Sequence, residues 1–141
     1  MLIKRTLVTA AALLMTPLLL GAGVRGDAEP YVCSLTKAVE CDSELCGAPA
    51  PPDLPFPTFI RVDLDNDLIT LLAPAERSGE TTQIRATERS GDYVAMTGIN
   101  AGRGWSMTLS ETNGAAVITV NLGNAAYVAF GQCIAEDLLL P

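Results

Sequence analysis

The chain has 141 residues, of which 49% are hydrophobic, with a formal charge of −7 and no histidine. This length allows one domain around one core, and the lack of histidine excludes Ser-His and Cys-His nucleophile pairs. The acidic balance argues against nucleic acid and anionic lipid headgroups as partners; it suits a cationic protein, or simply solubility.

Residues 1–26 have the three parts of a secretory signal peptide. Lys4 and Arg5 form a basic start, residues 6–20 form an apolar run, and residues 21–26 form a small-residue exit. The run is short for a membrane span, which needs about 20 apolar residues. We therefore expect a periplasmic or secreted protein without membrane attachment after cleavage, with an uncleaved anchor as the alternative.

The cleavage site has three candidates, Gly23, Gly26 and Ala28, of which we favour the last two. Removal of residues 1–26 would take away Lys4, Arg5 and Arg25 and keep all 16 acidic residues, which changes the formal charge from −7 to −10.

Residues 27–57 carry three of the four cysteines and a run of prolines. An even number of cysteines in a small exported domain predicts two disulfides, which can be connected in three ways. We favour a local Cys41–Cys46 ring and a Cys33–Cys133 bond that ties this segment to the last strand. Five prolines lie between residues 47 and 57. Because proline fixes φ and lacks an N–H donor, we expect an irregular, disulfide-tied segment over 27–57.

Residues 58–133 alternate apolar and polar residues with a period of two, which predicts antiparallel strands. Turn residues separate the runs, and Asn113-Gly114 is typical of a type I′ hairpin turn. The expected strands are 58–64, 68–73, 81–89, 93–97, 105–110, 116–122 and 126–130. A meander this small must hide its edges, so we predict an all-β, partly open antiparallel barrel, with a two-sheet sandwich as the alternative.

In the final strand, the expected apolar face and Cys133 fall on opposite sides. We expect Ala126, Val128 and Phe130 on its inner face, which would turn Cys133 outward. A β-bulge at Gly131 would restore Cys133 to the interior. Residues 134–141 then form a tail.

The loop before Trp105 is a candidate for partner binding, because Arg and Trp are enriched at binding hot spots. Arg103 and Trp105 are the residues concerned. The alternative is that Trp105 belongs to the core, since it shares the parity of Met107 and Leu109.

Three other chemistries are weaker candidates. Asp63, Asp65 and Asp67 suggest calcium, but Leu68 and Pro74 occupy positions that an EF-hand gives to Gly and Glu, so turn formation is the better interpretation. The cysteine spacing with no histidine does not suit zinc. Paired carboxylates could hydrolyse glycosides, but no spacing singles out a pair. We therefore predict no catalytic residues, metal or cofactor.

The pattern resembles a group of small exported bacterial β proteins without assigned activity. The resemblance lies in Tyr31–Cys33, Cys41, Cys46, the hairpin 105–114, and Phe130–Cys133. In size, export and architecture the chain is also similar to the small periplasmic lysozyme inhibitors, whose Ser-Gly-x-x-Tyr loop is loosely matched by residues 90–93, with the tyrosine one position early. The resemblance implies an exported β domain and carries over no functional residue.

Together these patterns predict an exported, non-catalytic binding or inhibitor-like module whose partner could be a cationic protein. A carrier of a small apolar ligand inside the barrel is the alternative, and a carboxylate-dependent hydrolase is a third.

Overall fold

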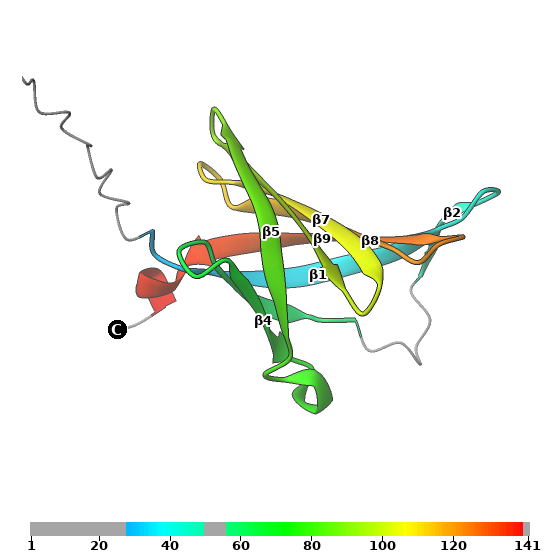
Figure 1. The fold of residues 1–141 in the computed structure, drawn as a ribbon, viewed down its shortest axis with the longest axis horizontal. Coiled ribbons are helices and arrows are strands. Elements are labelled where there is room, and N and C mark those ends of the chain that lie inside the picture. Colours follow the sequence, from blue (N-terminus) through cyan, green and yellow to red (C-terminus); the bar gives the residue numbers. More distant parts are fainter. Residues whose placement is uncertain (1–27, 50–55, 140–141) are drawn as a thin grey trace, which may run out of the picture.

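The computed structural model describes residues 28–49 and 56–139, which form an antiparallel β-barrel (Figure 1). The expected leader at 1–26 and most of the proline run lie outside the described residues. The strands are β1 (Tyr31–Cys41), β2 (Cys46–Pro49), β3 (Phe59–Asp63), β4 (Leu68–Ala73), β5 (Thr81–Ser90), β6 (Tyr93–Asn100), β7 (Arg103–Ser110), β8 (Ala115–Asn121) and β9 (Ala126–Ala135). Two short 3-10 helices, η1 (Ala75–Arg77) and η2 (Glu136–Leu139), follow β4 and β9.

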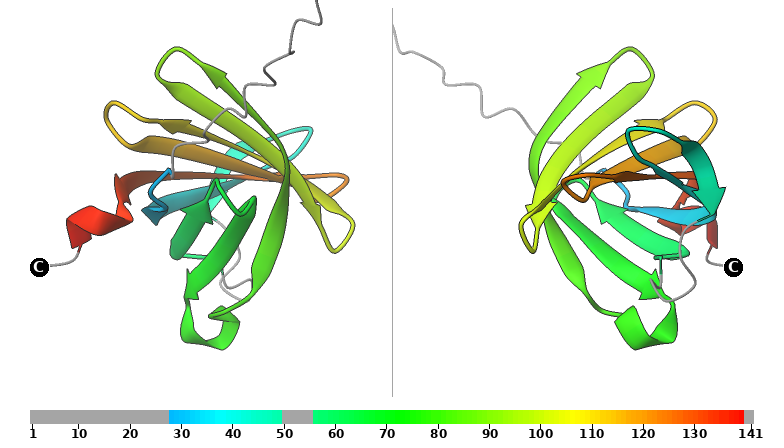
Figure 2. Two further views of the ribbon diagram at one scale, coloured as in Figure 1. Left: turned by 60° about the vertical axis from the view of Figure 1, so that its left-hand side comes forward. Right: turned by 90° about the vertical axis from the view of Figure 1, so that its right-hand side faces the viewer.

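The barrel is closed. Each strand from β3 to β9 pairs with the next one along the chain, and β1 pairs with both β3 and β9. The strand β2 lies outside this ring and pairs with the last residues of β1, beyond the residues of β1 that pair with β3. The predicted all-β antiparallel barrel is therefore confirmed, and its expected partial opening is replaced by a complete ring, seen end-on in Figure 2.

The N-terminal segment differs from the expectation of irregular structure over 27–57. Residues 31–41 form β1, an 11-residue strand that closes the barrel, and 46–49 form β2. In β1 the alternation of inward and outward side chains is broken, because the register with β9 shifts between Leu35 and Lys37. This bulge leaves Thr36 and Lys37 both exposed. Because the bulge interrupts the alternation of apolar and polar residues, the sequence pattern did not predict this strand.

The inner face of β9 was predicted wrongly. Tyr127, Ala129 and Cys133 are buried, whereas Phe130 is 42% exposed. The pairing of β9 with β8 is continuous through Gly131, so no bulge is needed to turn Cys133 inward. The irregularity lies in β1 instead, opposite Gly131. There a Cβ atom on residue 131 would collide with the carbonyl oxygen of Ser34.

The barrel interior is filled by the inward-facing residues of all its strands. Those at the middle of β6 and β7 are completely or almost completely buried: Val94, Met96, Met107 and Leu109. The strand β9 continues to Ala135 before η2 begins, so the expected tail at 134–141 starts with two residues of the sheet.

Candidate functional site: a pocket at one end of the barrel

One end of the barrel holds a cavity of about 280 Å³. It lies where β4 joins β5, β6 joins β7 and β8 joins β9, away from both described ends of the chain (Figures 1 and 2). Aliphatic side chains form most of its wall: Ile60, Ile69, Leu71, Ile118, Val120 and Leu122. Polar and charged side chains also line it: Arg77, Glu80, Thr82, Asn100 and Arg103. The cavity therefore has an apolar wall interrupted by a few polar groups.

Trp105 lines the cavity from β7, and its position depends on a glycine in the neighbouring strand. Trp105 pairs with Gly98 in the β6–β7 register. A Cβ atom at Gly98 would overlap the indole ring and lie 2.6 Å from the carbonyl oxygen of Gln83. The indole Nε1–H donates to Thr82 Oγ1 at 3.0 Å, which links β7 to β5 over the intervening strand β6. The Trp105 ring is half-buried, and its hydrogen bond to Thr82 fixes it in the wall of the cavity.

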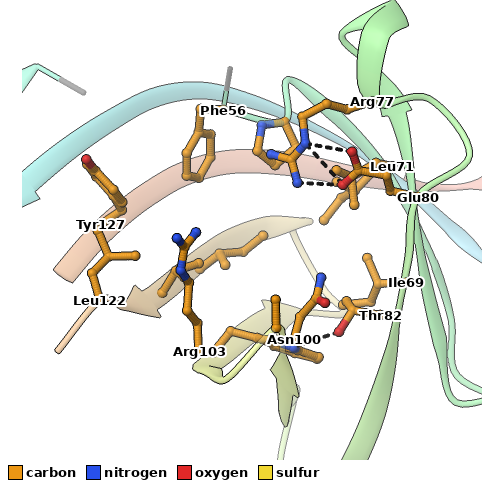
Figure 3. Close-up of a pocket in the computed structure, with 16 residues that line it drawn as sticks. Phe56, Ile69, Leu71, Arg77, Glu80, Thr82, Asn100, Arg103, Leu122 and Tyr127 are labelled. Atoms are coloured by element: carbon orange, nitrogen blue, oxygen red, sulfur yellow. Dashed lines mark hydrogen bonds and ion pairs between the residues drawn. The ribbon is translucent and has the colours of Figure 1, made fainter. Parts of the chain in front are cut away.

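Arg103 is placed by the tight turn between β6 and β7. Ala101 and Gly102 both have positive φ, 49° and 76°, as a two-residue type I′ turn requires. Arg103 follows directly as the first residue of β7, is exposed, and forms no ion pair with the residues that the structure describes. Figure 3 shows its guanidinium directed into the cavity, toward Phe56.

A second arginine at the cavity is already engaged. The Arg77 guanidinium lies 2.7 Å from the Glu80 carboxylate across the turn that contains η1. Hydrogen bonds from Arg77 hold the pKa of Glu80 below its usual value. These two charges offset each other, so Arg103 supplies the net charge among the described residues that line the cavity.

Two aromatic rings form another part of the wall. Phe56 and Tyr127 meet edge to face, with ring centroids 6.5 Å apart. Tyr127 is buried and donates from its hydroxyl to Glu40 Oε2 at 3.3 Å. The aromatic wall is thus fixed to β1 through Glu40.

The two residues singled out from the sequence, Arg103 and Trp105, therefore line the same cavity. Trp105 packs against the core, as its parity predicts, and it also borders the cavity, whereas partner binding by Arg103 and Trp105 stays a prediction. The sequence interpretation missed the aliphatic wall, Thr82, and the Arg77–Glu80 pair. The aliphatic wall could have been identified from the alternating positions along each strand that point into the barrel.

The aspartate cluster is used by the β3–β4 turn, at the opposite end of the barrel. Asp63 accepts the backbone N–H of Asn66 at 3.0 Å and is 2.9 Å from Arg61. Burial acts to raise the pKa of Asp63, but its bonds with Asn66 and Arg61 outweigh this and lower it. Among residues 28–49 and 56–139, no group of three Asp, Glu, Cys or His side chains could hold a metal ion.

The loop of residues 90–93, compared above with the inhibitor loop, also lies at this opposite end. It forms the turn between β5 and β6, and Tyr93 is 56% exposed. The structure therefore does not bring it near Arg103 or Trp105.

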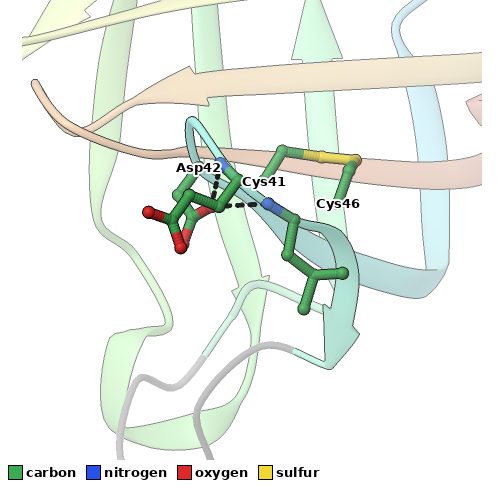
Figure 4. The surroundings of a disulfide bond; sticks show 5 residues. Cys41, Asp42 and Cys46 are labelled. Carbon is green, nitrogen blue, oxygen red and sulfur yellow. Dashed lines mark hydrogen bonds between the residues drawn. A yellow bond between two sulfur atoms is a disulfide. The ribbon is translucent and has the colours of Figure 1, made fainter.

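Both favoured disulfides are present. Cys33–Cys133 joins directly paired residues of β1 and β9, across the seam that closes the ring. Cys41–Cys46 closes the hairpin between β1 and β2, where the Asp42 carboxylate accepts the backbone N–H groups of Glu44 and Leu45 at 2.8 Å (Figure 4). Such bonds form and persist in oxidising environments, so the two disulfides indicate an oxidising compartment.

Within the described part of the chain, no helix has the length and apolar character needed to cross a membrane. Comparison with known proteins found no family model, no curated protein and no solved structure that matches the chain.

Proposed function

We propose that this protein is an exported, non-catalytic binding protein that holds a small, largely apolar ligand in the cavity at the barrel end. The observation that carries the proposal is an uneven filling of the barrel. Met96 and Met107 fill its middle, with at most 1% of either residue exposed, whereas a cavity of about 280 Å³ remains at one end.

Size and lining both support a small ligand. Binding sites for small molecules are concave, mostly apolar and about 300–1,000 Å³ in volume, with a few polar groups that fix orientation. This cavity lies at the lower limit of that range, and its aliphatic and aromatic wall with five polar or charged side chains has the same character. Closed eight-stranded barrels have an interior wide enough for one small ligand.

The chemistry of the cavity supports binding rather than catalysis. Glu80 is the carboxylate among the described lining residues, and it is paired with Arg77. The chain has no histidine, and all four cysteines are in disulfides. A general acid–base or nucleophilic reaction at this site would lack its usual groups.

Export to the periplasm or outside the cell is proposed on two grounds. Residues 1–26 have the pattern of a cleaved signal peptide. The disulfide across the β1–β9 seam and the one in the β1–β2 hairpin both need an oxidising compartment.

The experiment uses the neutral apolar dye N-phenylnaphthylamine, whose fluorescence rises in apolar surroundings. The exported protein should bind it at one site. Replacement Val120→Phe adds bulk to the cavity wall and should weaken binding about tenfold, which corresponds to about 1.4 kcal/mol.

The control is Val117→Phe, a change of the same size on the exposed face of the same strand. It should leave dye binding unchanged. No binding by the native protein, or equal loss in both variants, would contradict the proposed site.

A second candidate is the binding of a cationic protein, favoured by the β1–β2 hairpin. Its disulfide-closed tip presents the exposed acids Asp42 and Glu44 beside Leu45, which is 64% exposed. Capture of a basic partner that weakens at high salt and is lost in the double variant Asp42→Asn/Glu44→Gln would support it. Capture that is insensitive to salt would count against it.

A further inference from the structure

We infer that the cavity selects amphipathic anions, with the acidic group of the ligand bound to Arg103 and its apolar part against the aliphatic wall. This inference rests on the proposed function, because it names the chemical class of the ligand. A carboxylate attached to a short hydrocarbon chain has the required chemistry.

The charges at the cavity determine the sign of the ligand. Arg77, Glu80 and Arg103 are the charged side chains among its described lining residues. Arg77 and Glu80 form an ion pair at 2.7 Å, whereas Arg103 pairs with none of the described residues. Among the described cations, Lys37 and Arg85 also form no ion pair, but neither of them lines the cavity, so Arg103 is the unpaired charge at this site.

The geometry of Arg103 suits an acidic group rather than a neutral one. Figure 3 shows its guanidinium reaching over the space enclosed by Tyr127, Leu122 and Phe56. A guanidinium donates two parallel N–H bonds to a carboxylate, and such charge-assisted bonds are stronger than those between neutral groups. The side-chain amide of Asn100, on the same wall, offers a further donor.

The wall accounts for the apolar part of the ligand. Ile60, Ile69 and Ile118 extend the cavity inward from the polar groups and are each at most 8% exposed. Burying a hydrocarbon chain against them removes apolar surface from water, which favours binding. An anion without an apolar part would gain only the bond to Arg103.

The overall negative charge does not prevent this selectivity. The Debye length is about 8–10 Å at ionic strengths of 0.10–0.15 M, so distant exposed acids are screened. At contact distance the Arg103 guanidinium dominates, because Glu80, the acid among the described lining residues, is paired with Arg77. Binding should therefore persist at moderate salt.

The test compares decanoate with decanol, which share a hydrocarbon chain and differ in the charge of the head group. Trp105 is the sole tryptophan of the chain and lines the cavity, so its fluorescence reports binding directly. Replacement Arg103→Gln should weaken decanoate binding about tenfold and leave decanol binding unchanged.

The matched control is Arg85→Gln, which removes an equal charge from an exposed position on β5 outside the cavity lining. It should leave both affinities as they are in the native protein. Equal loss of decanoate binding in the Arg85 and Arg103 variants would overturn the inference, because a general charge effect would then explain it.

The remaining outcomes separate the two proposals. If both probes bind with the same affinity and Arg103→Gln changes neither, the cavity binds apolar ligands and the anion selectivity is wrong. If neither decanoate nor decanol changes the fluorescence of Trp105 and N-phenylnaphthylamine does not bind, the proposed function itself is wrong.

Discussion

Gly98 shows how one residue without a side chain builds the wall of the cavity. Its inward-facing hydrogen leaves the space that the Trp105 indole occupies, and the indole in turn reaches Thr82. Glycine is normally unfavourable in a strand, by about 0.5–1 kcal/mol relative to alanine. At this position a side chain would collide with the Trp105 ring, which lies directly opposite in the paired strand, so glycine is required despite this cost.

Replacement Gly98→Ala should therefore displace the indole and break its bond to Thr82. We expect a loss of roughly 1–3 kcal/mol in the free energy of unfolding and a shift in tryptophan emission. Urea unfolding followed by fluorescence measures both. Gly104→Ala is the control, since a Cβ atom there meets open space. If Gly98→Ala is as stable as Gly104→Ala, the packing argument is wrong.

Asp63 shows the same dependence on local partners at the opposite end of the barrel. It is 7% exposed and bonded to Asn66 and Arg61, and its pKa is lowered by these bonds against the effect of burial. A carboxyl whose folded pKa lies below its unfolded value, about 3.9, stabilises the fold above that pH. This stabilisation is lost as the pH falls through the folded pKa.

Replacement Asp63→Asn should therefore lower stability at neutral pH by roughly 1–3 kcal/mol, and less at strongly acidic pH. Urea midpoints at about pH 7 and pH 2–3 test this difference. Asp65→Asn is the control, because an amide oxygen can still accept the Ala28 N–H that Asp65 accepts now. An equal loss at both pH values in Asp63→Asn would contradict the role of its charge.

At the scale of elements, the seam between β1 and β9 determines whether the sheet is a barrel. These two strands pair over almost their whole lengths and are joined by Cys33–Cys133, with a sequence separation of 100 residues. The Cys41–Cys46 ring spans a separation of 5. A disulfide that closes a longer loop restricts the unfolded chain more.

Removal of Cys33–Cys133 by a double alanine replacement should cost about 4–5 kcal/mol, and the same change at Cys41–Cys46 about 2 kcal/mol. Chemical unfolding of the two variants against the native protein provides the comparison. Equal losses would mean that loop closure does not dominate the effect of the seam bond.

The elements differed in how well their sequences predicted them. The strands β7 and β8 were predicted because Trp105, Met107 and Leu109 alternate cleanly and Asn113-Gly114 marks the turn between them. The strand β1 was missed because its bulge interrupts the alternation, and β9 was assigned the wrong inner face because Phe130 is larger than Ala129. The size of Phe130 suggested that it is buried, whereas the pairing of β9 with β8 places Ala129 inside and Phe130 outside.

The register of β5 shows a related limit. Ile84 is 3% exposed, but Ala86, two residues further along the same strand, is exposed because the register with β6 shifts between them. Few apolar residues in this strand constrain the register, so neighbouring strands set it.

At the scale of the whole molecule, the two ends of the barrel have different characters. One carries the hydrogen bonds and ion pairs around Arg61, Asp63 and Glu136, and the other carries the cavity. Arg103 and Trp105 could be predicted as candidates from their types and loop. The cavity could not, because it depends on the sizes of inward side chains contributed by strands distant in sequence.

Ligand binding in the cavity is tested most directly by a titration with decanoate, followed by the backbone and indole N–H signals in NMR spectra. We predict shifts at Arg103, at the indole N–H of Trp105 and at Leu122, with the signals of Asp92 and Glu111 at the opposite end unchanged. Shifts centred on the opposite end or on the β1–β2 hairpin, with none at Trp105, would contradict this prediction.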